Sequence, residues 1–407
     1  MDNGNGRSHH RQSTMSSNLE KHLAGELAAL EAAGLRRELR PVDSPQGVRL
    51  RMGHRELLNF SSNDYLGLAN HPALKEAATV AIEKFGAGAG AARLISGSQS
   101  PHHELESALA DFKGTEAALA FSSGYAAALG TVPALVGAGD VVVVDKLVHA
   151  SLVDAAKLSG AKLRVCKHND LADLARILEW AAEQGGRTLV VAESVYSMDG
   201  DLAPLLNLVE LKEQHGAWLM LDEAHATGLY GEGRRGVAEE FGMAARVEVQ
   251  MGTLGKALGA AGGYICGSNE LIELLRHRAR SFVFSTAPMP AQAAAARAGI
   301  EVVQSPEGEQ RKTRLWSLVD ELKNGLIACG WKLPVVQSAI LPLMVGAETK
   351  AVALSERLLE AGVFVPAIRN PTVARGEARL RITVSADHSS NDIKKLLEVL
   401  GEEKGDA

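Results

Sequence analysis

The sequence has few of the residues that mark secreted or metal-binding proteins. Only three cysteines occur in 407 residues, and Cys166, Cys266 and Cys329 lie far apart without any C-x-x-C spacing. This pattern gives neither a disulfide framework nor a cysteine zinc site, and it suits a reducing compartment. No H-E-x-x-H or other metal-ligand spacing occurs either. We therefore predict structural thiols and no metal.

Long apolar runs and blocks of one charge are also missing. No run is long enough to cross a bilayer, and the polar N-terminal stretch lacks the apolar core of a secretory signal. The formal net charge is -6 and no basic block stands out, which argues against nucleic acid or a membrane surface as a partner. We expect a cytoplasmic protein that acts on small molecules.

Aromatic residues make up only 4% of the chain, whereas short apolar runs rich in Val, Leu and Ala are frequent. Seven such runs alternate with helical patterns in the middle of the sequence. Their apolarity is continuous, which indicates strands buried on both faces and hence an α/β domain with a mostly parallel sheet covered by helices. The predicted strands are 118–123, 140–145, 162–168, 188–194, 217–224, 247–253 and 262–268.

The two ends of the chain have other patterns. Residues 19–39 repeat apolar positions at helical spacing and predict an amphipathic helix that ends near Pro41. Beyond Pro290 a long Ala-rich helix precedes two strand patterns, "SAILPLMVG" and "ARLRITVSA", and a final amphipathic helix, "NDIKKLLEVLG". The predicted organisation is a disordered tail at 1–18, an N-terminal helix and arm at 19–62, a large domain at 63–290 and a smaller α+β domain at 291–407.

Polar residues follow several predicted strands, where ligands of open α/β sheets bind. The segment "FSSGYAAALG" (121–130) leads from a strand into a helix, whose first N–H groups could hold a phosphate. His149 follows another strand, although an isolated histidine is more often structural. Lys256 lies among small residues in "MGTLGKALGAAGGY" (251–264), where a solvated surface lysine is the plain alternative.

Asp222, Glu223 and His225 follow the most hydrophobic strand and spell the DEAH box of helicases. An ATPase would also need a GxxxxGK[ST] loop to hold the phosphates. The segment "GTLGKAL" lacks both this glycine spacing and a hydroxyl residue after Lys256, which argues against an ATPase. A phosphate cradle, a buried aspartate, a histidine and one lysine at the strand ends of one sheet instead suit pyridoxal phosphate (PLP), which needs a lysine amine, an acid for its ring nitrogen and donors for its phosphate.

From about Leu35 to the last helix the chain resembles the α-oxoamine synthases, PLP enzymes of fold type I. The resemblance implies a central, mostly parallel seven-stranded sheet flanked by helices, with a smaller α+β C-terminal domain. It is carried by "NFSSNDYLGL" (59–68), "HASLVDAA" (149–156), "HNDLADL" (168–174), "SVYSMDGDLAPL" (194–205), "LDEAHATGLYGEGRRG" (221–236), "GTLGKALGAAGGY" (252–264) and "NPTVARGEARLRITVSADH" (370–388).

The resemblance also assigns roles to particular residues. Lys256 would carry the cofactor and remove the α-proton, and Asp222 would pair with the pyridine nitrogen. His149 would stack on the ring, while His225 and Ser197 would lie at its ring oxygen. The remaining implied contacts are Ser123, Gly124, Tyr125 and Thr253 with the phosphate, Ser285 and Thr286 with the phosphate bound by a second subunit, and Arg36, Asn63, Thr372 and Arg381 with the substrate.

The family joins an amino acid to an acyl thioester with loss of carbon dioxide, in homodimers that share their active sites. "SAILPLMVG" and "NPTVARGEARLRITVSADH" favour L-alanine with pimeloyl-CoA or a pimeloyl carrier protein. "GTLGKALG" and "ISGSQSPHHELE" also suit the member that joins glycine to acetyl-CoA, and serine palmitoyltransferase and 5-aminolevulinate synthase are further alternatives. A catalytically silent subunit is the alternative from another class, and the intact Lys256, Asp222 and His149 argue against it.

Some neighbouring polar residues have plain structural interpretations. Arg379 and Arg381 lie two positions apart on a predicted strand, so one of them could face solvent. Glu193 and Asp201 could be turn or packing residues. Tyr125 replaces a Phe that is usual in the family motif, and this changes little because the backbone N–H would make the phosphate contact.

Overall fold

The computed structural model describes residues 17–32, 35–36 and 39–401. The chain forms two compact units, Met1–Pro41 and Val42–Ala407. The first unit contributes one described helix, α1 (Asn18–Ala32). This helix is shorter than predicted, since the described residues 35–36 and 39–40 are not helical. The tail predicted at 1–18 falls almost entirely outside the described residues.

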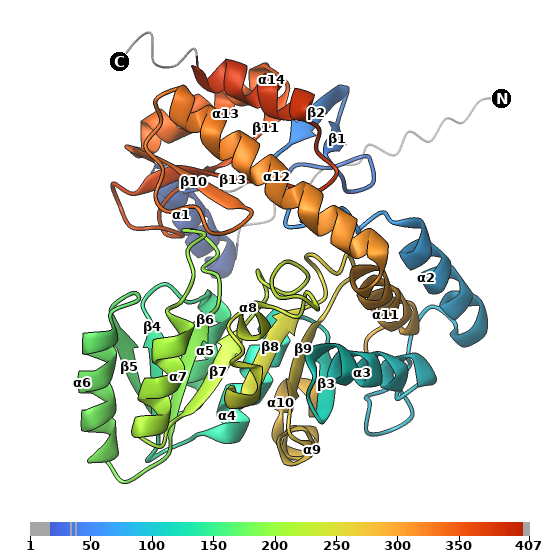
Figure 1. Cartoon of the computed structure of the whole chain (residues 1–407), viewed down its shortest axis with the longest axis vertical. Coiled ribbons are helices and arrows are strands. Elements are labelled where there is room, and N and C mark those ends of the chain that lie inside the picture. Colours follow the sequence, from blue (N-terminus) through green and yellow to red (C-terminus); the bar gives the residue numbers. More distant parts are fainter. Residues whose placement is uncertain (1–16, 33–34, 37–38, 402–407) are drawn as a thin grey trace, which may run out of the picture. The chain divides into compact units, whose positions relative to one another are not determined.

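A seven-stranded sheet forms the centre of the second unit (Figure 1). The strand order is β3-β9-β8-β7-β6-β4-β5, and β9 runs antiparallel to the other six strands. Each of the seven apolar runs forms one of these strands, so the predicted sheet is confirmed. The strands are β3 (Ala117–Phe121), β4 (Val141–Asp145), β5 (Lys162–Cys166), β6 (Thr188–Glu193), β7 (Trp218–Asp222), β8 (Val249–Thr253) and β9 (Gly263–Gly267).

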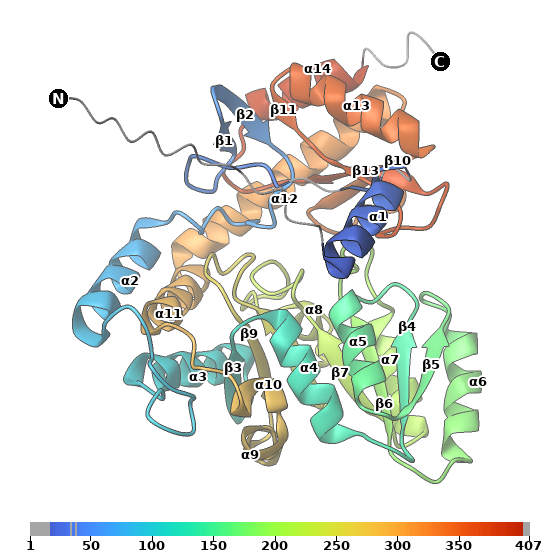
Figure 2. The same ribbon diagram turned by 180° about the vertical axis from the view of Figure 1, so that it is seen from behind.

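Helices cover both faces of this sheet. Figure 2 shows α4 and α5 on one face, and Figure 1 shows α6 and α7 on the other. The inner strands are therefore buried on both faces, as the run Val141–Val144 illustrates. The helices of this part are α2 (Pro72–Phe85), α3 (Ser100–Lys113), α4 (Gly124–Leu135), α5 (Ala150–Leu158), α6 (Leu171–Ala182), α7 (Leu205–Gln214), α8 (Val237–Glu240), α9 (Asn269–Arg278) and α10 (Arg280–Val283), with a 3-10 turn at Ala244–Arg246.

The edge strand β5 differs from the expectation of burial on both faces. Lys162, Arg164 and Val165 are exposed, and Cys166 is buried. The prediction was wrong here because β5 pairs only with β4. An edge strand needs fewer apolar side chains than an inner one, and charged residues there discourage pairing with another chain.

The C-terminal part forms a smaller sheet in the order β10-β13-β12 with α13 and α14 packed nearby. The long helix α12 runs from α11 to this part (Figure 1). The N-terminal hairpin β1–β2 pairs with β11, so residues before the large domain join the C-terminal part. The elements are β1 (Arg49–Met52), β2 (Arg55–Asn59), α11 (Pro290–Gln304), α12 (Pro306–Ala328), β10 (Ile340–Gly346), α13 (Glu348–Glu360), β11 (Val363–Phe364), β12 (Ala367–Ile368), β13 (Ala378–Thr383) and α14 (Ser390–Gly401).

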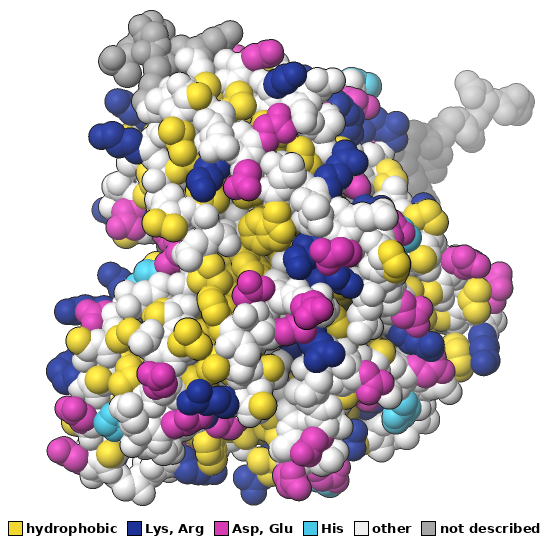
Figure 3. Space-filling model, in the orientation of Figure 1, with side chains coloured by type: hydrophobic (Ala, Val, Ile, Leu, Met, Phe, Trp, Pro, Cys, Tyr) yellow, Lys and Arg dark blue, Asp and Glu magenta, His cyan; other side chains and the backbone are white. Residues whose placement is uncertain are grey.

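The surface shows no block of one charge on the face drawn in Figure 3, where basic and acidic side chains alternate. Within the described ranges, no helix combines the length and apolarity that a bilayer span requires. The same residues contain no His, Cys, Asp or Glu cluster suited to a metal ion. All three cysteines are free thiols.

Candidate active site

Residues from separate parts of the sequence meet where the strands of the large sheet end. Strands β4, β6, β7 and β8 are parallel, and β3 has the same direction because both β3 and β8 are antiparallel to β9. Their carboxyl ends therefore lie at one edge of the sheet. Asp222 ends β7 and Thr253 ends β8, while Ser123 and His149 follow β3 and β4.

Lys256 lies in the loop after β8 and is linked to His225. Its Nζ is 2.8 Å from His225 Nε2, and His225 Nδ1 is 2.6 Å from the hydroxyl of the fully buried Tyr65. Burial lowers the pKa of Lys256 to about 8. Burial, with the charge of Lys256 as the next cause, lowers the pKa of His225 well below its ordinary value. The neutral fraction of the lysine amine near neutral pH is therefore larger than that of an exposed lysine.

Asp222 is almost completely buried at the end of β7. Its Oδ1 accepts a hydrogen bond from Ala224 N at 2.9 Å, and no described residue donates one to Oδ2. Burial raises the pKa of Asp222, while the positive charge of Lys256 opposes this rise. A buried carboxylate with an open oxygen can stabilise a positively charged donor placed beside it.

The start of α4 presents free backbone donors. Ser123 is the N-cap, and its hydroxyl accepts from Ala126 N at 3.0 Å. Helical geometry leaves the N–H groups of Gly124 and Tyr125 without an intrahelical acceptor, and no described residue accepts from them. A Cβ added at Gly124 would lie 3.8 Å from Thr253 Cβ, so the ends of β3 and β8 are adjacent. This corner can hold an anion.

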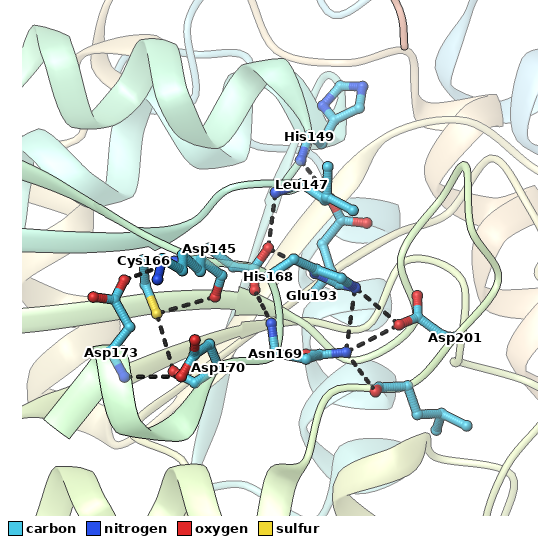
Figure 4. A network of polar contacts seen from close by, with 12 residues as sticks. Asp145, Leu147, His149, Cys166, His168, Asn169, Asp170, Asp173, Glu193 and Asp201 are labelled. Carbon is cyan, nitrogen blue, oxygen red and sulfur yellow. Dashed lines mark hydrogen bonds and ion pairs between the residues drawn. The ribbon is translucent and has the colours of Figure 1, made fainter. Parts of the chain in front are cut away.

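His149 is the N-cap of α5, and its ring is held by Ser151. Nδ1 accepts from Ser151 N at 3.2 Å and lies 2.8 Å from the Ser151 hydroxyl. Its backbone N–H donates to the Glu193 carboxylate (Figure 4). Burial, followed by the charge of Asp222, raises the pKa of Glu193 to about 8. Glu193, for which a turn or packing role was the plain alternative, therefore contacts the backbone of the predicted ring-stacking histidine.

Arg381 on β13 brings the C-terminal part to the same site. Its Nε donates to Ser197 O at 2.5 Å, and both of its terminal nitrogens lie 3.1 Å from Asn63 Oδ1. Its NH2 nitrogen is also 3.5 Å from the Tyr65 hydroxyl. Three predicted residues, Asn63, Ser197 and Arg381, are thus joined to the Lys256 group through Tyr65.

Four predicted residues have no described contact with this group. Arg36 lies in the first unit, where it pairs with Glu31 at 3.1 Å. Thr372 lies in an exposed loop before β13. Ser285 and Thr286 make no described hydrogen bond to the other predicted site residues, and Thr286 instead pairs with Ala92. Their assigned contacts stay predictions.

Tyr65 is a site residue that the sequence did not indicate, and the sequence pattern allowed an exposed position for Arg379 or Arg381. Tyr65 belongs to the quoted segment "NFSSNDYLGL", but nothing local indicates its contact with His225, which lies 160 positions later. The solvent-facing interpretation is wrong for both arginines, since Arg379 and Arg381 are buried. Arg379 pairs with Asp199 at 2.6 Å.

Glu223, the second letter of the DEAH segment, is completely buried. Its carboxylate forms an ion pair with the buried Lys113, and its Oε1 accepts from Ala238 N at 2.8 Å. A DEAH ATPase uses acidic side chains that can reach a metal-bound nucleotide. The paired and enclosed Glu223 does not suit that use, so it is a structural residue.

The available groups fit PLP. The free N–H groups of Gly124 and Tyr125 suit its phosphate, and the open oxygen of Asp222 suits its ring nitrogen. Lys256 supplies an amine whose pKa is lowered to about 8. The exposed ring of His149 lies near Asp222 and Lys256, since both charges act on its pKa.

Known proteins are similar to this chain in sequence and in fold. The chain matches the family Aminotransferase class I and II over residues 55–400. It is 49% identical over 383 residues to the 8-amino-7-oxononanoate synthase of Geobacter sulfurreducens, covering 94% of this chain and 97% of that protein. It is also similar to a solved structure of SPT with PLP as an internal aldimine, with a TM-score of 0.88 and 31% identity over 95% of this chain and 98% of that one.

A crystal structure of 8-amino-7-oxononanoate synthase from Francisella tularensis is similar as well, with a TM-score of 0.74 and 27% identity. The alignment covers 86% of this chain and 98% of that one. The chain therefore belongs to the aminotransferase class I and II family and, within it, to the 8-amino-7-oxononanoate synthases.

Proposed function

We propose that this protein condenses L-alanine with a pimeloyl thioester, releasing carbon dioxide and the free thiol and giving 8-amino-7-oxononanoate for biotin synthesis. One observation carries the chemistry: the line Lys256–His225–Tyr65 lies beside Asp222 and is joined to Arg381. The identity of 49% to a relative of this name supports the substrate pair predicted from the sequence over glycine with acetyl-CoA.

The cofactor is PLP, as the family and the PLP-containing neighbour support. When bound, PLP supplies an electron-withdrawing ring that stabilises negative charge developing on the α-carbon of the amino acid. Gly124, Tyr125 and Thr253 would hold its phosphate, and His149 would cover its ring. Asp222 would hold a proton on the ring nitrogen, because a buried carboxylate favours a positive partner.

Arg381 would bind the carboxylate of L-alanine. Its guanidinium has five N–H donors in a planar fork that matches a carboxylate. Asn63 Oδ1 and Ser197 O accept some of these donors and fix the plane of the fork. Because Arg381 is also close to Tyr65, the bound carboxylate is oriented relative to the Lys256 group.

Lys256 would remove the α-proton of L-alanine. A base works best when its pKa lies near the working pH, and burial lowers the pKa of Lys256 to about 8. His225 Nε2, 2.8 Å away, limits the positions that the amine can take. The α-carbon then attacks the thioester carbonyl carbon, the thiolate leaves, and the resulting β-keto acid loses carbon dioxide.

We also propose a cytoplasmic homodimer. Leu94 and Ile95 are 52% and 79% exposed, and Phe284 and Met289 are 70% and 44% exposed. The antiparallel Ala92–Thr286 bridge brings these two segments together, and we call the four apolar side chains that flank it the exposed cluster. A second copy covering this cluster would bury Ser285 and Thr286 beside its own site, in agreement with their predicted role.

The first test is thiol release by the purified, PLP-loaded protein. L-alanine with pimeloyl-CoA is compared with glycine plus acetyl-CoA and with L-serine plus palmitoyl-CoA, and the product is identified by mass. We expect the first pair to give the largest kcat/KM. A larger value for either other pair would overturn the substrate assignment.

Two further samples complete this test. A pimeloyl carrier protein replaces pimeloyl-CoA to identify the thiol carrier. Lys256→Ala is expected to be inactive, and a low residual thiol release by this variant gives the background. Wild-type turnover by Lys256→Ala would contradict the role of the lysine.

A further inference from the structure

His168, in the loop after β5, lies between two carboxylates and takes no part in the mechanism described above (Figure 4). Its Nδ1 is 3.0 Å from Asp145 Oδ1, and its Nε2 is 2.9 Å from Asp201 Oδ2. Both ring nitrogens can donate at once only when the imidazole is protonated. The ring therefore acts as a cationic bridge between Asp145 and Asp201.

Asp145 connects this bridge to the turn that leads to His149. The aspartate ends β4, and its Oδ1 accepts from Leu147 N at 2.8 Å while its Oδ2 accepts from Asn169 N at 2.9 Å. The turn is thus fixed two residues before His149, the predicted ring-stacking residue. Asn169 has a φ of 51°, a left-handed conformation that Asn tolerates better than most residues.

Asp201 connects the bridge to the loop that carries Ser197. The Tyr196 N–H donates to Asp201 O at 3.0 Å, and the Tyr196 ring lies edge-on to the His168 ring with centroids 4.5 Å apart. Asn169 Nδ2 donates to Asp201 Oδ2 at 3.0 Å and to Leu202 O at 3.2 Å. The backbone on both sides of Ser197 is therefore held by contacts that converge on His168 and Asn169.

The charges of this cluster favour the bridge at neutral pH. Burial disfavours the imidazolium, but the hydrogen bonds to Asp145 and Asp201 outweigh it and raise the pKa of His168 to about 10. The side chains of His168, Asp145 and Asp201 are 24%, 10% and 28% exposed. Partial burial of this kind strengthens charge-assisted hydrogen bonds relative to those in water.

We propose that His168 is a positioning residue for cofactor binding. Its bridge sets the spacing between the turn before His149 and the loop of Ser197. The inference rests on the proposed function, because His149 and Ser197 are cofactor contacts only in that assignment. His168 touches neither cofactor nor substrate in this scheme. Its loss would allow the two segments to separate and would weaken the contacts that both make with PLP.

The test uses the holoenzyme and the variant His168→Gln, whose side chain can no longer bridge two carboxylates with a charge. Release of PLP after transfer to cofactor-free buffer is followed by the visible absorbance of the bound cofactor. We expect release about tenfold faster than from the wild type, the size that corresponds to losing one charge-assisted hydrogen bond. Visible circular dichroism of the retained cofactor should also change, because the ring would be held less rigidly.

His277→Gln is the matched control. His277 is also bonded to a carboxylate, Glu273 at 3.0 Å, but it is 71% exposed on α9, and its variant should release PLP as the wild type does. Lower thermal stability of His168→Gln with unchanged PLP release and unchanged circular dichroism would overturn the proposal, since a purely structural role predicts that result.

A second variant keeps the proposal testable if His168→Gln does not fold. Asp201→Asn keeps the shape of the side chain and removes one charge, and it should accelerate PLP release in the same direction. The double variant should release PLP no faster than the faster of the two single variants, because both substitutions break the same bridge. PLP release does not depend on the acyl substrate, so a wild type inactive with L-alanine and pimeloyl-CoA would refute the substrate assignment and leave this result standing.

Discussion

At the scale of single residues, the proton-bearing groups around Lys256 form one line. The buried His225 is neutral, so only one of its ring nitrogens carries hydrogen. When Nε2 accepts from the Lys256 amine, Nδ1 donates to the Tyr65 oxygen, and the Tyr65 hydroxyl is left to face Asn63 Oδ1 at 3.3 Å. The hydrogen-bond network thus assigns His225 the tautomer in which Nδ1 carries the hydrogen. The donors and acceptors keep this order as long as the Lys256 amine donates to His225.

Asp222→Asn is expected to separate activity from stability. The variant removes the negative charge and keeps the shape, so kcat should fall by about 10²- to 10³-fold, the usual cost of losing one preorganised electrostatic contact. Thermal stability should stay the same or rise, because burial already makes the charge of Asp222 unfavourable and raises its pKa. Thiol release and thermal unfolding measure both effects.

Asp320→Asn, at an exposed position on α12, is the control for this pair of measurements. It should change neither kcat nor thermal stability. Wild-type kcat in Asp222→Asn would show that the carboxylate has no electrostatic role in the reaction.

Lys113→Met should destabilise the protein through Glu223. Both partners of this ion pair are completely buried, so removing the lysine leaves an unpaired buried carboxylate, at a cost of about 3–5 kcal/mol. The double variant Lys113→Met with Glu223→Gln should recover part of this loss. Urea unfolding measures the free energies, and equal stability of wild type and Lys113→Met would contradict the argument.

At the scale of elements, the loop between β6 and α7 is held from both parts of the second unit. His168 and Asn169 hold it from the large sheet through Asp201. Arg379, on β13, holds it from the C-terminal sheet through Asp199 at 2.6 Å. Asp199 and Asp201 lie two positions apart on this loop. Through them the loop of Ser197 is connected to β13, the strand that carries Arg381.

The bridge from His168 to this loop should make the free energy of unfolding fall at alkaline pH. The pKa of His168 in the folded protein, about 10, lies above the ordinary value of 6.5. Its contribution is therefore fully present below about pH 6.5 and is lost as the pH rises through about 10. Urea unfolding at pH 6.5, 8 and 10.5 should show the wild type losing roughly 1–3 kcal/mol relative to His168→Gln across this range. A pH-independent difference between the two proteins would refute the bridge.

The sequence predicted the presence of helices and strands better than it predicted where a helix ends or which strand lies at the edge of the sheet. All seven strands of the large sheet were found because buried parallel strands are continuously apolar over a few residues. The exposed character of β5 was missed because the position of a strand in the sheet depends on which strand it pairs with. The helix ending near Pro41 was predicted too long because periodicity alone does not show where intrahelical hydrogen bonds stop.

At the scale of the whole molecule, the exposed cluster of Leu94, Ile95, Phe284 and Met289 should decide oligomeric state. Ile95→Lys with Phe284→Lys places two charges in it, so light scattering should report half of the wild-type mass. Activity should fall at least about tenfold, because Ser285 and Thr286 would no longer reach a second site, while far-ultraviolet circular dichroism stays native.

Leu158→Lys is the control, since Leu158 is 63% exposed at the end of α5 and lies outside this cluster. It should leave the mass and the activity unchanged. A double variant that keeps the wild-type mass would show that this surface is not the interface between subunits.

The sequence by itself determined the strands of the large sheet, the position of Lys256 after one of them, and the family. These features depend on patterns within a few residues, because burial on a sheet selects side chains locally. The tertiary structure alone decided that Tyr65 contacts His225, that Glu223 pairs with Lys113 and that Arg379 pairs with Asp199. These partners lie more than 100 positions apart, and only the packing of the folded chain brings their polar atoms within hydrogen-bond distance.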